Sequence, residues 1–171
     1  LIVGASGGIA SALIEQYSSE GARVFAVSRA PISDTSHSGD VTYHQLAEQD
    51  HRHISEFVEQ LAEQQVVLTT VVITTGFLHR ESDGIHPEKR LEDVSEQALA
   101  AYFSTNSIIP AMWLKHLVNI MSKEGSTLVC LSARVGSISD NGLGGWYGYR
   151  ASKAALNMLV KTASVEYKRR L

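Results

Sequence analysis

The stretch VVLTTVVITTG, Val66–Gly76, is apolar, rich in β-branched residues and closed by a glycine. A continuous apolar run of this kind is typical of a strand buried on both faces, because a half-exposed strand would alternate apolar and polar residues. Strands covered on both faces occur mainly in parallel sheets, whose connections are helices. The stretch therefore predicts a central strand of a parallel α/β sheet.

Apolar strands alternate with helical patterns on both sides of this stretch. Further strands are predicted at 1–3, 22–29, 41–46 and 126–132, and helices at 9–19, 51–64, 95–121 and 146–170. Pro110 lies within the third helical pattern and is expected to kink or divide it. Since right-handed crossovers place helices on both faces of such a sheet, the order predicts a doubly wound, Rossmann-type α/β fold in a single domain, 1–171.

Composition excludes several classes of protein. The chain has 171 residues, of which 44% are hydrophobic, enough for one sizeable core. A net charge of −3 without a basic run gives no nucleic-acid surface, and no apolar stretch is long enough for a membrane span, so we expect a cytoplasmic protein. His51 and His53 stand two apart, which sends them to different faces of a helix, and we expect no metal site. The chain starts within a strand pattern and stops at basic residues, so we expect it to be incomplete at the C-terminus.

The first motif is VGASGGIA, Val3–Ala10, at the first strand–helix junction. Gly4, Gly7 and Gly8 would let the backbone turn tightly and approach a ligand, while the following helix N-terminus offers unpaired amides to a pyrophosphate. The alternative is a tight turn without a ligand. The position of the motif favours dinucleotide binding.

The second motif follows the second predicted strand, where dinucleotide-binding folds often carry a carboxylate for the ribose hydroxyls. Here the residues are Ser28 and Arg29. A guanidinium at this point suits a 2′-phosphate, which favours NADP(H) over NAD(H). The alternative is an exposed arginine at a strand end.

The third motif is a tyrosine and a lysine four residues apart, Tyr149 and Lys153 in YGYRASKAAL. At this spacing they share one face of a helix. A nearby ammonium favours the phenolate, so Lys153 is expected to lower the pKa of Tyr149 and make it an acid for a carbonyl oxygen. Taken alone, the pair could equally be a solvated surface pair.

Together these motifs resemble the short-chain dehydrogenase/reductase family, over essentially the whole chain, and the run from Leu131 to Leu159 is similar to its C-factor-like branch, related to small carbonyl reductases. The resemblance implies an oxidoreductase that moves hydride between NADP(H) and a carbonyl or secondary alcohol, as a homodimer or homotetramer. It also implies catalytic roles for four residues and cofactor contacts from others. The catalytic set is Tyr149, Lys153, Ser132 and Asn106, and the cofactor set is Gly4, Ser6, Gly7, Gly8, Ile9, Ser28, Arg29, Gly76, Tyr149 and Lys153.

The chain departs from the family pattern at four places, one of them around Ala47, where the aspartate that commonly meets the adenine is replaced. Ala10 replaces a third glycine, and Ile73–Gly76 keeps only the last residue of the usual Asn-Asn-Ala-Gly. The catalytic serine position falls on Ala133, so Ser132 would have to supply the missing hydroxyl, although adjacent residues of a strand point to opposite faces. These departures leave open a second hypothesis, a dinucleotide-binding signalling or regulatory protein with little or no catalysis.

Overall fold

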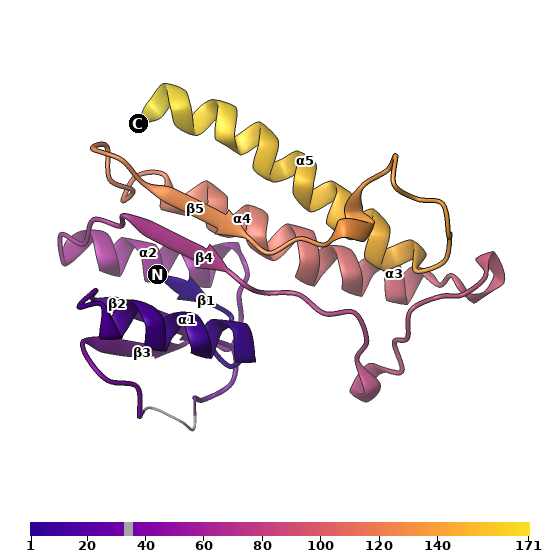
Figure 1. The fold of residues 1–171 in the computed structure, drawn as a ribbon, viewed down its shortest axis with the longest axis horizontal. Helices are drawn as coiled ribbons and strands as arrows, with labels where there is room; N and C mark the ends of the chain where they lie inside the picture. Colours follow the sequence, from indigo (N-terminus) through magenta and orange to yellow (C-terminus); the bar gives the residue numbers. More distant parts are fainter. Residues whose placement is uncertain (33–35) are drawn as a thin grey trace. The chain divides into compact units, whose positions relative to one another are not determined.

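The computed structural model describes residues 1–32 and 36–171 (Figure 1). The described chain divides into two compact units. The first unit contains Leu1–Thr74, His116–Leu131 and Leu171, and the second contains Thr75–Lys115 and Ser132–Arg170. The chain therefore passes from the first unit to the second just after two of its strands.

The first unit is built on a five-stranded sheet with the order β3-β2-β1-β4-β5. All neighbouring strands are parallel, and Ile2 of β1 pairs with Ala26 of β2 on one side and with Val72 of β4 on the other. The strands are β1 Ile2–Val3, β2 Val24–Ser28, β3 Val41–Gln45, β4 Thr70–Ile73 and β5 Thr127–Cys130. The predicted doubly wound parallel sheet is confirmed.

Helices α1 (Gly8–Ser19) and α2 (His51–Glu63) cover opposite faces of this sheet. Ala10 and Ile14 of α1 pack in one buried cluster with Val24 and Ala26. Phe25 points to the other face, because side chains alternate along a strand. There it stacks on His44, whose ring meets Phe57 of α2 edge-on.

Strand β4 is shorter than the sequence predicts. We expected a strand over 66–76, but β4 covers only Thr70–Ile73. Gln65 ends the preceding helix with a left-handed backbone (φ 57°), and the Val66 N–H then bonds back to the Leu61 carbonyl. Val67 lies in irregular structure between this turn and β4 and is 64% exposed. The apolar run thus combines a helix-ending turn with a strand.

The second unit contains α3 (Glu96–Phe103), most of α4 (Ile109–Leu117) and α5 (Tyr147–Arg170). The predicted helix over 95–121 is divided by a π-helical segment, Ser104–Ile108. Pro110 explains this division. It has no N–H, so a regular α-helix would leave the carbonyl of Asn106, four residues earlier, without its donor.

Candidate active site

The chain makes a tight glycine turn between β1 and α1. Gly4 has a φ of 92°, a left-handed conformation that favours glycine. The N–H groups of Gly4 and Ala5 both donate to the Val27 carbonyl, at 2.8 and 2.9 Å. Gly7 is the N-cap of α1, and within 1–32 and 36–171 no side chain caps it. Residues 6–9 are exposed, so the first amides of α1 are accessible to an anion.

The end of β4 is tied to the same turn. The Thr74 hydroxyl donates to the Val3 carbonyl at 2.8 Å and reaches the Gly4 carbonyl at 3.3 Å. Sequence reasoning treated this position only as a departure from the family pattern. The structure gives Thr74 a part in shaping the glycine turn.

Ser28 and Arg29 stand at the carboxyl end of β2, as expected. Ser28 is 1% exposed, and its hydroxyl donates to the Ala30 carbonyl. Arg29 is exposed, and its carbonyl accepts a hydrogen bond from Gln45 at 3.3 Å. The guanidinium of Arg29 is thus the accessible group at this strand end, while the Ser28 hydroxyl serves the local backbone.

In the second unit, Asn106 lies in the π-helical segment and is fully buried. Its side-chain oxygen accepts the Phe77 N–H at 2.9 Å. Its amide nitrogen donates to the Phe77 carbonyl and to the Ser152 hydroxyl, both at 3.1 Å. One side chain therefore joins the segment after β4, the π-helical segment and α5. π-Helical turns of this kind occur frequently at functional sites.

Lys153 of α5 is a buried cation, only 3% exposed. A β-carbon placed on Gly76 would stand 3.1 Å from Lys153 Nζ and 3.3 Å from Asn106 Oδ1. A larger residue at 76 would crowd both groups, so the glycine keeps the space beside them. Gly76, Asn106 and Lys153, all selected from the sequence, lie together in the second unit.

Tyr149 lies one helical turn before Lys153, and the Lys153 ammonium is 5.9 Å from the centre of its ring. The Tyr149 ring also meets Tyr102 and Trp146 edge-on, with ring centres 6.3 Å apart in each case. Burial raises the pKa of the Tyr149 phenol above its usual value of 10. The net direction is therefore opposite to the expected lowering of this pKa, because desolvation of the phenolate is the dominant influence.

Ser132 lies beyond the end of β5, which stops at Cys130. Strand alternation therefore does not decide which way its side chain points, and the residue is exposed. The short 3₁₀ turn Arg134–Gly136 follows and packs against α5: a β-carbon on Gly136 would stand 3.0 Å from the Lys153 backbone. Replacement of the missing family serine by Ser132 stays a prediction.

Sequence reasoning missed Ser152, which is fully buried between Tyr149 and Lys153. Its hydroxyl donates to the Tyr149 carbonyl at 2.9 Å and accepts from Asn106, and its own carbonyl accepts from Ser107 at 2.7 Å. A polar residue next to the lysine, on an otherwise apolar helix face, was the available signal.

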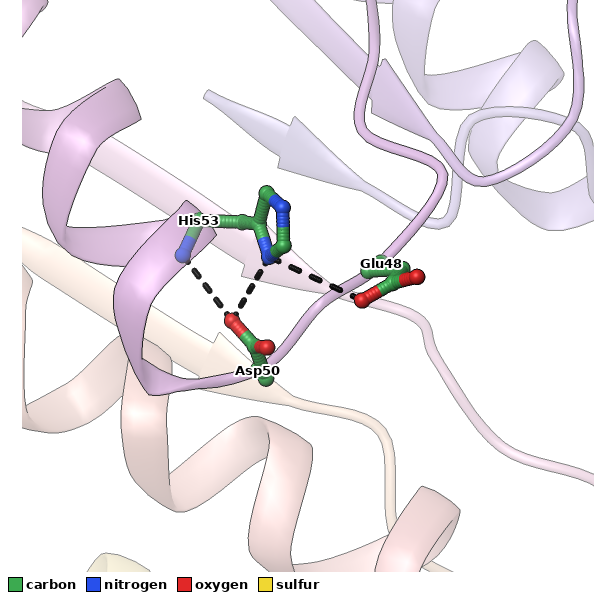
Figure 2. A group of neighbouring side chains, drawn as sticks. All are labelled: Glu48, Asp50 and His53. Atoms are coloured by element: carbon green, nitrogen blue, oxygen red, sulfur yellow. Dashed lines mark hydrogen bonds and ion pairs between the residues drawn. The ribbon is translucent and has the colours of Figure 1, made fainter.

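Glu48, Asp50 and His53 form a group at the start of α2 (Figure 2). Asp50 is the N-cap of α2: its Oδ1 accepts the His53 backbone N–H at 2.9 Å and faces His53 Nδ1 at 2.8 Å. The backbone hydrogen bond is the main cause of a lowered Asp50 pKa. His51 instead meets His116, with 2.8 Å between ring nitrogens. Asp50 thus serves as the helix cap, and Glu48 Oε2 lies 4.0 Å from His53 Nδ1.

Comparison with known proteins gives the family. A model of the short chain dehydrogenases matches residues 1–170. The chain belongs to the short chain dehydrogenase family.

The chain is similar in sequence to a curated relative, the 1-hydroxy-2-glutathionyl-2-methyl-3-butene dehydrogenase of Rhodococcus sp. (strain AD45). It is 26% identical over 159 residues, which cover 93% of this chain. The chain spans 66% of the length of that relative.

Solved structures show the same fold. A carbonyl reductase from Pseudomonas aeruginosa PAO1 in complex with NADP superposes with a TM-score of 0.79 at 24% identity, covering 97% of this chain and 75% of its own. The carbonyl reductase Sniffer of D. melanogaster gives a TM-score of 0.81 at 19% identity, covering 99% and 75%. Within the described residues, no helix is long and apolar enough to cross a membrane.

In the first unit, the glycine turn fits the pyrophosphate of a dinucleotide of the kind this family uses. The N-cap Gly7 leaves helix amides accessible to a pyrophosphate. Among the described residues, the buried Thr75 Oγ1 lacks a hydrogen-bond partner, and it adjoins Gly76. An orphaned hydroxyl of this kind is suited to a bound polar ligand.

Proposed function

We propose that this protein is an NADP(H)-dependent oxidoreductase of the carbonyl reductase type, with residues 1–171 acting as one dinucleotide-binding domain. The observation that carries the proposal is the cluster of Tyr149, Lys153 and Asn106 in the second unit. Asn106 and Lys153 are buried, and Tyr149 is half-buried beside them. A tyrosine and a lysine that formed only a solvated surface pair would not be buried in this way.

In the proposed reaction Tyr149 handles the proton. Burial keeps its phenol protonated at neutral pH, so its hydroxyl can donate to a carbonyl oxygen as negative charge develops there. The proton moves from Tyr149 to the substrate oxygen, and the carbonyl becomes an alcohol. In the reverse direction the phenolate accepts the proton from the alcohol.

Lys153 stabilises the phenolate that remains after the proton has left, because its ammonium is held one turn away in a setting with little water. Asn106 fixes the second unit around these groups through Phe77 and Ser152. Ser132, if it takes the place of the family serine, donates a hydrogen bond to the same substrate oxygen.

NADPH, when bound, supplies the hydride that the carbonyl carbon receives. Gly4, Ser6, Gly7, Gly8 and Ile9 would meet its pyrophosphate, and Lys153 its nicotinamide ribose, by the family resemblance. Arg29, exposed at the end of β2, would pair with the 2′-phosphate. Solved neighbours with NADP agree with this preference.

The proposal extends to the setting of the protein. The substrate is a small carbonyl compound or alcohol, the protein works as a homo-oligomer, and its location is the cytoplasm. A regulatory C-factor-like protein is the alternative, and no described feature favours it over the enzyme.

The deciding experiment measures NADPH oxidation with a panel of aldehydes and ketones. Tyr149→Phe is expected to lower kcat about 10²- to 10⁴-fold, the usual contribution of a general acid. The dissociation constant of NADPH should stay within about twofold, since the ring is kept. Tyr17→Phe, on α1, is the matched control and should behave as the wild type. Full activity of Tyr149→Phe, or tight NADPH binding without any turnover by the wild type, would contradict the proposal.

A further inference from the structure

Glu88 is a buried carboxylate in the loop between β4 and α3, and it is only 3% exposed. Burying a charged group is costly unless a partner compensates for the lost water. Its partner is 60 residues away: both carboxylate oxygens lie 3.3 Å from the backbone nitrogen of Gly148, whose N–H they accept. Gly148 is the second residue of the 24-residue helix α5, whose N-terminus favours a negative charge.

The backbone of Glu88 holds the same helix start. Its carbonyl accepts the N–H of Trp146, the residue just before α5. Trp146 has a φ of 54°, a left-handed conformation that is unfavourable for a bulky residue and persists only where its surroundings impose it. Arg150 secures the other side of this turn through the carbonyls of Gly144 and Gly145, at 3.1 and 2.9 Å.

Gly148 makes the close approach of Glu88 possible. A β-carbon at this position would stand 2.3 Å from Tyr102 Cδ2 and 2.9 Å from Glu88 Oε1. The backbone here therefore lies between the Tyr102 ring and the Glu88 carboxylate. Tyr149 is the next residue, so the position of its side chain depends on where this backbone is held.

We propose that Glu88 is a positioning residue for Tyr149, an inference that rests on the proposed function. Its carboxylate fixes the first turn of α5, and that turn sets where the phenol meets the substrate oxygen. When the contact is lost, the helix start shifts and the phenol spends less time in a productive geometry, so kcat falls. Lys153 lies one turn further along, and NADPH binding is therefore largely kept.

Two variants separate the effect of side-chain length at residue 88 from the effect of its negative charge. Glu88→Gln keeps the length of the side chain and an oxygen for the Gly148 N–H but removes the charge. Glu88→Asp keeps the charge but is one methylene too short to make the contact. Asp93→Ala is the matched control, because Asp93 is an acidic residue whose side chain accepts the N–H groups of Lys89 and Arg90 in the same loop.

The test measures kcat, KM and the NADPH dissociation constant for these three variants and the wild type. Glu88→Asp should lower kcat roughly tenfold or more, with NADPH binding within about twofold. Glu88→Gln and Asp93→Ala should stay near the wild type. Equal losses for Glu88→Gln and Glu88→Asp, or wild-type kcat in Glu88→Asp, would overturn the proposal.

Hydrogen exchange of the Gly148 amide gives a readout that needs no substrate. We expect this amide to be protected in the wild type and in Glu88→Gln, and to exchange faster in Glu88→Asp. A wild type without turnover but with this exchange pattern would refute the proposed function. The proposed hold of Glu88 on the Gly148 N–H would still stand. Unchanged exchange of the Gly148 amide in Glu88→Asp would refute the proposed role of Glu88 in fixing the first turn of α5.

Discussion

Asn106 and Ser152 meet side chain to side chain across 46 residues of sequence, with 3.1 Å between Asn106 Nδ2 and Ser152 Oγ. Both residues are fully buried. Polar groups buried to this extent depend on one another, because water cannot replace a lost partner. The contact therefore links stability to the geometry of α5.

Asn106→Ala should cost about 2–3 kcal/mol of unfolding free energy, since it leaves the Phe77 N–H without a partner and removes the donor to the Phe77 carbonyl and to the Ser152 hydroxyl. Urea denaturation would measure the loss. Asn141→Ala removes one exposed bond, to the Gly144 N–H at 3.1 Å, and should cost about 1 kcal/mol or less. Similar losses for the two variants would contradict the importance of burial.

Arg29→Ala should weaken NADP binding about ten- to a hundredfold and leave NAD binding nearly unchanged. A charged hydrogen bond contributes about 1.5–3 kcal/mol, which corresponds to this range. Calorimetric titration with both cofactors checks it. Arg23→Ala, an exposed arginine 3.8 Å from Asp40 at the opposite end of β2, is the control. An equal loss of affinity for NADP and for NAD would show that Arg29 does not bind the 2′-phosphate.

Trp146→Ala should raise KM for bulky aromatic carbonyls more than for small aliphatic ones. The indole is 38% exposed and stands edge-on to Tyr149, so it offers an apolar surface beside the proposed acid. Steady-state kinetics with paired substrates would show the difference. Leu143→Ala, on the same loop and 96% exposed, provides the comparison. An equal rise for both substrate classes would mean that Trp146 only supports the fold.

His44 should make the protein acid-sensitive. Its Nε2 is buried and, within the described chain, has no hydrogen-bond partner. Burial lowers its pKa below 6.5. The unfolded chain then binds a proton at a higher pH than the folded one, so stability is complete above about pH 6.5 and falls as the pH drops through the lowered value.

Denaturation between about pH 7 and pH 5, the range in which histidine titrates, would test this dependence. His44→Phe, which suits the ring contacts with Phe25 and Phe57, should flatten the slope. His79→Gln, at an exposed position, should leave it unchanged. An identical slope in His44→Phe would assign the acid sensitivity to other groups.

The sequence was sufficient for the alternation of strands and helices, and it selected Asn106, Lys153 and Gly76, which the structure brings together. These succeed because hydrophobic periodicity and glycine turns are local properties. The π-helical segment was not predicted, since one extra residue in a helical turn leaves no clear trace in the periodicity. Glu88 was missed because its partner Gly148 is distant in sequence. The direction of the Tyr149 pKa depends on how far the ring is buried, which only the fold determines.

The π-helical segment also fixes the length of the chain between two core aromatic residues. Tyr102 precedes the segment, Trp113 follows it, and both are fully buried. Each residue of a helix advances the direction of its side chains by about 100°. Deleting a single residue within 104–108 would therefore change the direction of one of these buried rings, and we expect such a deletion to lower the midpoint of thermal denaturation. In this stretch the number of residues is therefore constrained as tightly as the identity of the buried Asn106.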